Sequence, residues 1–98
     1  MKSKKKKQID DIIENFNFEK VEKIMTLLAW TWFNSPSGVP TIEELKSQSK
    51  KMLKDVYEHA ESNDDSSISL RTGGLRAQAT SFIDGDISLS LSFEVATW

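Results

Sequence analysis

Apolar residues in the first two thirds of the chain recur every three or four positions, which is the period of an α-helix. This period predicts three helices, at residues about 7–15, 18–32 and 42–60. The second helix carries one apolar stripe, formed by Val21, Ile24, Met25, Leu28 and Trp32. The third begins with a capping-box signature, in which Thr41 and Glu44 each bond to the other's backbone amide. Its apolar face consists of Ile42, Leu45, Ser49, Met52, Leu53, Val56 and Ala60.

From Ser67 onward the period changes to two, because every second residue is apolar. Three strands are predicted, at residues about 67–72, 75–82 and 86–96. The first turn, Gly73-Gly74, is a two-residue hairpin signal. A two-residue second turn would pair apolar with polar side chains, whereas a three-residue loop over 83–85, with Gly85 left-handed, pairs Ala79 with Leu89 and Ala77 with Leu91.

The predicted fold class is α+β. It is a two-layer sandwich of two to three N-terminal helices packed on a C-terminal three-stranded antiparallel meander. We expect the second and third helices to cover the sheet, where Ala77 and Ala79 form a shallow floor. The domain organisation is one domain over residues 9–98, preceded by a basic disordered tail over residues 1–8.

Composition and charge restrict the classes of function. The net charge is −2, but Lys2 and Lys4 to Lys7 lie at the start, so the remainder carries about −7. An acidic surface disfavours the phosphate backbone of a nucleic-acid duplex. The absence of cysteine excludes disulfides and thiolate chemistry, and no apolar run reaches the length of a membrane span. We therefore expect a cytoplasmic protein with no membrane association.

Candidate catalytic and metal sites are weak. The single histidine, His59, falls at the end of the third helix, with no nucleophile at a suitable spacing. Asp64-Asp65 and Asp84-Gly85-Asp86 lack the ligand number of a calcium loop, and Thr72-Gly73-Gly74 lacks the lysine and helix of a P-loop. We expect no enzyme activity, no cofactor and no metal.

Two groups of residues are candidates for contact with a partner. The aromatic cluster Trp30, Trp32 and Phe33 points around more than half a helical turn. Trp30 and Phe33 either fold under the loop at residues 34–38 or form an exposed anchor patch. The other candidates are Arg71, Arg76 and Phe82, which alternation places on the polar face of the sheet. Arginines beside hydroxyl groups suit an acidic or phosphate-bearing partner.

Four segments resemble small uncharacterised proteins encoded by bacteriophages and prophages. They are Asn17-Phe18-Glu19-Lys20-Val21, Trp30-Thr31-Trp32-Phe33, Val39-Pro40-Thr41-Ile42-Glu43-Glu44-Leu45-Lys46 and Thr72-Gly73-Gly74-Leu75. The resemblance covers residues about 16–95 and brings no catalytic residues. It implies a phage-type accessory protein in a bacterial host cell, of the kind that inhibits host defence.

The leading expectation is therefore a non-catalytic protein that binds and inhibits a bacterial defence protein stoichiometrically. Its acidic surface would occupy a basic site, helped by aromatic anchors. A second possibility is a small-ligand binder that sequesters a nucleotide, with Arg71 and Arg76 on the phosphates. A third is a self-assembling structural module, a homo-oligomer joined through the last strand or the aromatic cluster.

Overall fold

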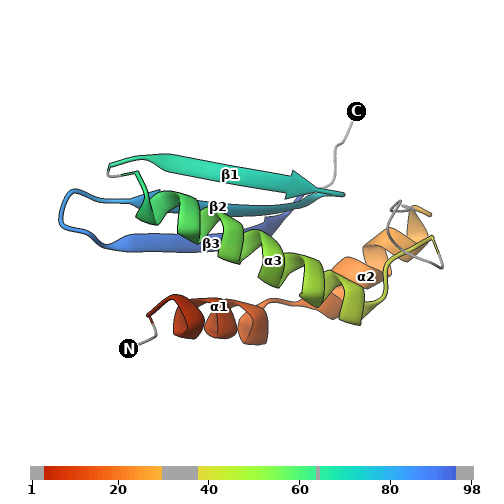
Figure 1. Ribbon diagram of the computed structural model, residues 1–98. Coiled ribbons are helices and arrows are strands. Elements are labelled where there is room, and N and C mark those ends of the chain that lie inside the picture. Colours follow the sequence, from red (N-terminus) through yellow and green to blue (C-terminus); the bar gives the residue numbers. More distant parts are fainter. Residues whose placement is uncertain (1–3, 30–37, 64, 95–98) are drawn as a thin grey trace.

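A computed structural model describes residues 4–29, 38–63 and 65–94. The elements in chain order are α1 (Lys4–Asn15), α2 (Phe18–Leu27), α3 (Ile42–Glu61), β1 (Ser67–Thr72), β2 (Leu75–Ser81) and β3 (Ile87–Phe93). The strands form one antiparallel sheet in the order β1-β2-β3, and the helices lie on one side of it (Figure 1). The predicted α+β class, with helices packed against a three-stranded meander, is confirmed.

The register of the sheet follows from the alternation of side chains. Leu70 lies opposite Ala77 and Ala79 lies opposite Leu89, so apolar residues share the inner face. Gly73 and Gly74 have φ values of +53° and +96°, which a two-residue turn of this kind requires. At the second turn the Phe82 amide donates to the Asp86 carbonyl (2.9 Å), and Gly85 has φ +93°. The predicted three-residue loop is therefore correct.

The core lies between α3 and the central strand. Ala77 and Ala79 are fully buried under α3, together with Leu45, Leu53 and Val56. Small side chains on β2 let the helix approach closely, as the sequence indicated. The turn after α3 is fastened to β2 by Ser81, whose hydroxyl donates to the Asn63 carbonyl and accepts from the Ser66 amide.

Side-chain caps determine where two of the helices begin. Thr41 Oγ1 accepts from the Glu44 amide (3.2 Å), and the Glu44 carboxylate accepts from the Thr41 amide (2.8 Å). This capping box satisfies two amides at the start of α3 and confirms the prediction. Asn17 Oδ1 accepts from the Lys20 amide (3.0 Å) and caps α2, again as predicted.

The first helix is longer than the sequence pattern suggested. It begins at Lys4 rather than near residue 7, so most of the segment expected to be a disordered tail is helical. Three lysines of that segment pair with carboxylates: Lys4 with Asp86 (3.1 Å), Lys5 with Glu58 (3.2 Å) and Lys6 with Asp10 (2.9 Å). Lys4 and Lys5 thus lie near acidic residues of distant segments, which the local sequence does not reveal, whereas Lys6 and Asp10 are neighbours within α1.

These ion pairs also alter the charge argument. Three of the five N-terminal lysines lie beside carboxylates, so part of the acidic charge of the remaining chain is offset locally. The hydrogen bond to Asp86 raises the pKa of Lys4. A raised lysine pKa means that this contribution to stability is present at neutral pH and is lost as the pH rises through the raised value.

The second helix is shorter than predicted and packs elsewhere. It ends at Leu27 rather than near residue 32, because Ala29 adopts φ +51° and its amide turns back to the Thr26 carbonyl. It packs on α3 beyond the end of the sheet, and α1 instead joins α3 over the strands (Figure 1). Periodicity identifies an apolar stripe but not the surface that covers it, which explains the error.

The capping box gives the first testable prediction. Thr41→Ala removes the acceptor for the Glu44 amide, and we expect the free energy of unfolding to fall by about 1 kcal/mol. Urea denaturation followed by circular dichroism measures this loss. Ser47→Ala, an exposed site within α3, is the matched control and should change stability little. Equal stability of the wild type and Thr41→Ala would contradict the role assigned to the cap.

A buried hydroxyl group gives the second testable prediction. Ser49 is fully buried on α3, and among the described residues its Oγ has no hydrogen-bond partner. Because a buried polar group without a partner costs about 1–3 kcal/mol, Ser49→Ala should raise the free energy of unfolding. Thermal and urea unfolding, with Ser47→Ala again as the control, test this. A destabilised Ser49→Ala variant would show that the hydroxyl is bonded in solution.

Candidate binding surface

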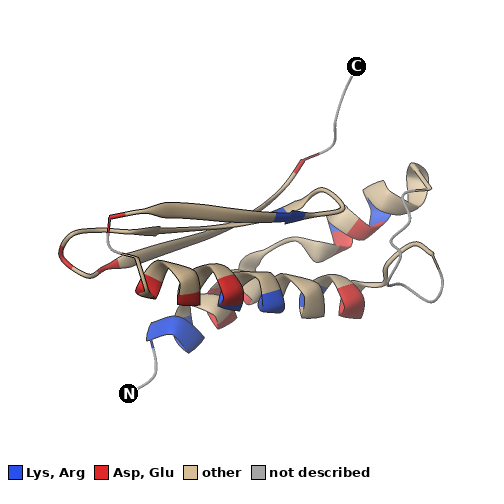
Figure 2. Cartoon of the chain, turned by 45° about the horizontal axis from the view of Figure 1, so that its top comes forward, with Lys and Arg blue, Asp and Glu red and all other residues tan. Residues whose placement is uncertain are grey.

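The side of the sheet opposite the helices is a candidate binding surface, and we call it the outer face. Its strand residues are Ser67, Ser69, Arg71, Arg76, Gln78, Thr80, Ser88, Ser90 and Ser92. Phe82 and Glu94 continue the same alternation just past the ends of β2 and β3. No helix of the described residues covers it (Figure 1). Its strands carry little charge, with a basic residue near the β1–β2 turn and acidic residues in the opposite turn (Figure 2). The polar face predicted from alternation is thus present and open.

Two arginines meet at one end of the outer face. Arg71 and Arg76 are direct cross-strand partners, so their side chains leave the same face side by side. Like charges directly opposite in a sheet are unfavourable by ~0.2–1 kcal/mol. Glu94 is the compensating carboxylate, with its Oε1 3.8 Å from Arg71 Nη2. Both partners of this ion pair are about two-thirds exposed, so it offsets little of the repulsion.

Arg76 is more constrained than Arg71. It is half-buried, whereas Arg71 is exposed. Its Nε is shielded from solvent, and no hydrogen bond within the described chain reaches it. A guanidinium held in this way has lost part of its hydration and is more restricted than one on a fully exposed side chain. It can therefore bind an anionic group with a smaller loss of entropy than a free surface arginine.

The middle of the outer face consists of short polar side chains. Ser67 Oγ lies 3.4 Å from Thr80 Oγ1, and Gln78 Nε2 donates to Ser67 Oγ (3.3 Å). These groups both donate and accept, so they can bond to a polar backbone or side chain without imposing a charge.

The opposite end of the outer face carries two exposed apolar side chains beside the acidic residues of the β2–β3 turn. Phe82 is 47% exposed and Ile83, beside it in the β2–β3 turn, is 84% exposed. Six residues of strand separate Phe82 from Arg76, which is about 20 Å. The structure therefore places the candidates Arg71 and Arg76 together and Phe82 at the far end of the same face. Ile83 was missed by the sequence analysis, because turn residues were assigned only a conformational role.

The remaining candidates fall as follows. Trp30, Trp32 and Phe33 lie outside the described residues. His59 is exposed at the end of α3, as expected. Within the described ranges no three His, Asp or Glu side chains gather in a way that could hold a metal ion. None of the helices in the described part is long and apolar enough to cross a membrane.

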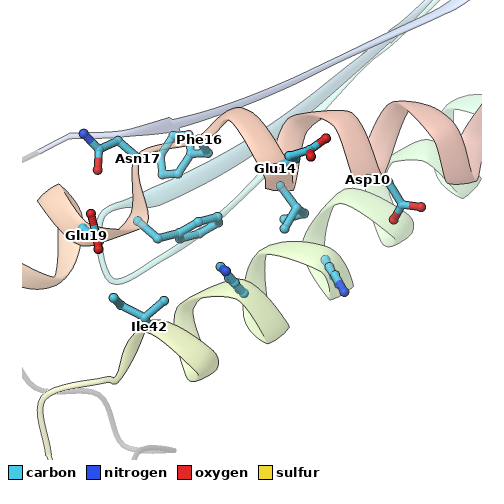
Figure 3. Close-up of a pocket in the computed structure, with 10 residues that line it drawn as sticks. Asp10, Glu14, Phe16, Asn17, Glu19 and Ile42 are labelled. Carbon is cyan, nitrogen blue, oxygen red and sulfur yellow. The ribbon is translucent and has the colours of Figure 1, made fainter.

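The structure also contains an open groove of about 570 Å³ that the sequence did not indicate (Figure 3). It lies where α1, the start of α2 and α3 meet. Asp10 and Glu14 approach it from α1, and Lys46 and Lys50 line it from α3. The apolar part of the lining consists of Ile13, Phe16, Phe18 and Ile42, with the rings of Phe16 and Phe18 in edge-to-face contact.

The outer face is the stronger candidate of the two. The groove is lined by carboxylates of α1 and lysines of α3 alike, so its mixed charge selects no one class of ligand. Two arginines placed opposite each other oppose folding, and a feature of that kind points to function. Comparison of the chain with protein-family models, with curated proteins and with solved structures gave no match. The case for the outer face therefore depends on its own geometry.

The repulsion between Arg71 and Arg76 predicts that replacing one arginine does not destabilise the fold. Arg71→Gln removes the repulsion with Arg76, so the free energy of unfolding should stay unchanged or rise by up to about 0.5 kcal/mol. Glu94→Gln is the matched control and should lower it slightly, with the loss disappearing at high salt. Urea denaturation at low and high salt measures both. A loss above ~1 kcal/mol for Arg71→Gln would make Arg71 a structural residue instead.

Proposed function

We propose that this protein acts by binding a partner protein through its outer face. The observation that carries the proposal is the Arg71–Arg76 pair, an arrangement that is unfavourable for folding and favourable for an anion. A carboxylate of the partner placed between the two guanidinium groups would relieve their repulsion. The exposed Phe82 and Ile83 at the other end of the face would supply an apolar anchor.

The finer function is a stoichiometric inhibitor of a bacterial defence component, made by a phage or prophage and acting in the host cytoplasm. The resemblance of residues 16–95 to small phage-encoded proteins supports this context. An inhibitor of this kind needs a surface rather than an active site, and the outer face is such a surface.

The mode of binding differs from the one expected from charge alone. Lys4, Lys5 and Lys6 pair with carboxylates. This weakens the expectation that an acidic surface of the protein occupies a basic site on its partner. At the end of the outer face near the β1–β2 turn, Arg71 and Arg76 lie beside the one carboxylate of Glu94, so this end favours an acidic patch on the partner.

A charge-reversal experiment tests the proposal. We expect the wild-type protein to retain one host protein at a molar ratio near one from a lysate of the defence-bearing strain. The double variant Arg71→Glu/Arg76→Glu should lose it, because both contacts to the acidic patch become repulsive. Lys51→Glu, which reverses an exposed charge on the helical layer, is the matched control and should bind like the wild type.

The functional readout is the plating of a phage that the defence system restricts. Wild type and Lys51→Glu should restore plating on the defence-bearing host, and Arg71→Glu/Arg76→Glu should not. Equal rescue by the double variant, or equal retention of the same protein, would exclude the outer face as the inhibitory surface.

A nucleotide-sequestering protein is the second candidate, and the same arginine pair favours it because phosphate also fits between two guanidinium groups. The aromatic residue of the outer face in the described chain, Phe82, is too far along β2 to stack on a base bound there. Calorimetry with cyclic di- and trinucleotides distinguishes the two functions. Heat that disappears in Arg71→Glu/Arg76→Glu would favour the nucleotide, and no heat with any of them would exclude it.

A further inference from the structure

The two edge strands of the sheet, β1 and β3, differ in how far the helices cover their outer edges. In β3 the even-numbered residues bond to β2, as shown by Phe82 N to Asp86 O and Glu94 N to Gly74 O (both 2.9 Å). Odd-numbered residues therefore present their amide and carbonyl groups at the outer edge. There Gln8 Nε2 of α1 donates to the Ile87 carbonyl (3.2 Å). α1 lies against β3 and covers this edge (Figure 1).

Among the residues that the structure describes, no helix or side chain covers the edge formed by β1 in this way. The Ser81 amide donates to the Ser66 carbonyl (2.8 Å), so residues 66, 68, 70 and 72 bond to β2. The amide and carbonyl groups of Ser67, Ser69 and Arg71 then point outward. No hydrogen bond of the described residues reaches them. The strand contains no proline and no carboxylate, which are common means of preventing edge pairing.

The apolar row of β1 is also left without full cover. α3 packs mainly on β2, and α1 lies on the β3 side of α3, so the helical layer is displaced away from β1. Leu70 points to the inner face but is 38% exposed, and Ile68 is only half-buried. On β3, which is also an edge strand, every inner-face residue is at least half-buried, so Leu70 is the inner-face residue of the described sheet that is left exposed.

We propose that β1 pairs with β1 of a second copy, antiparallel about a two-fold axis at Ser69, to form a continuous six-stranded sheet. This register places Ile68 opposite Leu70 of the second copy, so the exposed Leu70 and the half-buried Ile68 each gain an apolar neighbour. It places Arg71 opposite Ser67 of the second copy, so like charges do not meet. A shift of the axis to Ser67 or Arg71 would lose one of these matches.

The displaced helices make this dimer sterically possible. In a sheet joined through β3, the two α1 helices would meet across the axis, because each lies on the β3 side of its own α3. In a sheet joined through β1, the nearest helices are the two α3 helices, each set back over β2. Neighbouring strands are about 4.8 Å apart, so about 14 Å would separate the two α3 axes. Packed helices lie about 8–10 Å apart, so the two helices would not clash.

Pairing would also enlarge the outer face. Three strands give a face about 14 Å by 20 Å, or about 300 Å², whereas a standard interface uses about 800 Å² from each partner. Six strands approximately double that area and bring two arginine pairs onto one surface. The dimer does not depend on the proposed function, since its hydrogen bonds and apolar contacts involve other groups.

The association state tests the dimer. Sedimentation equilibrium of the wild type should give twice the chain mass of 11.1 kDa at high concentration, dissociating on dilution. Leu70→Lys should be monomeric at every concentration, with its fold confirmed by circular dichroism. Leu27→Lys is the matched control, because it makes the same substitution at a more exposed leucine on α2, beyond the end of the sheet, and should still dimerise. A wild type that is monomeric at its highest soluble concentration would overturn the proposal.

Crosslinking tests the edge and the register without disturbing the apolar contacts. The chain contains no cysteine, so Ser69→Cys introduces a unique thiol. At the two-fold axis its Cα atoms would be about 5.5 Å apart, within range of a disulfide. Mild oxidation should convert Ser69→Cys to a covalent dimer. Ser90→Cys, at the centre of β3 on the same face, should stay monomeric, and preferential crosslinking of Ser90→Cys would show that the wrong edge was chosen.

Discussion

The close packing of α3 on the central strand decides most of this structure. Ala77 and Ala79 leave room for the helix to lie directly over β2, where both alanines become fully buried. A helix is about 10 Å wide and covers two strands, so the remaining cover must come from one side. α1 takes that position beside β3. Larger side chains on β2 would lift α3 and remove the reason for this arrangement.

Three properties of the surface follow from that single contact. The helices all lie on one side of the sheet, so its other side stays open. The offset toward β3 allows Gln8 to reach the edge carbonyl of Ile87 and leaves Leu70 of β1 partly exposed. The two candidate interaction surfaces, the outer face and the β1 edge, are thus consequences of how one helix sits on two alanines.

The position of α1 beside α3 also decides which charged residues are neighbours. Because the start of α1 lies near the β2–β3 turn and the end of α3, Lys4 and Lys5 meet Asp86 and Glu58. Basic and acidic residues that are well separated in the sequence thus lie side by side and offset each other's charge. On the outer face, by contrast, one group of like charges stays close together. It is the pair of arginines on the outer face, where Glu94 is the nearest opposite charge at 3.8 Å from Arg71.

The sequence by itself determined the elements of the second half of the chain, the register of the sheet and the capping box of α3. These depend on local chemistry: alternation fixes which residues share a face, and Thr41 and Glu44 are three residues apart. From the same alternation, it placed Arg71, Arg76 and Phe82 on one face. Only the tertiary structure decided that α1 rather than α2 joins α3 over the sheet, that the lysines fold into α1, and that a groove opens beside Phe16. Each of those depends on contacts between distant segments, and an apolar stripe or a charged run looks the same in the sequence whichever surface it meets.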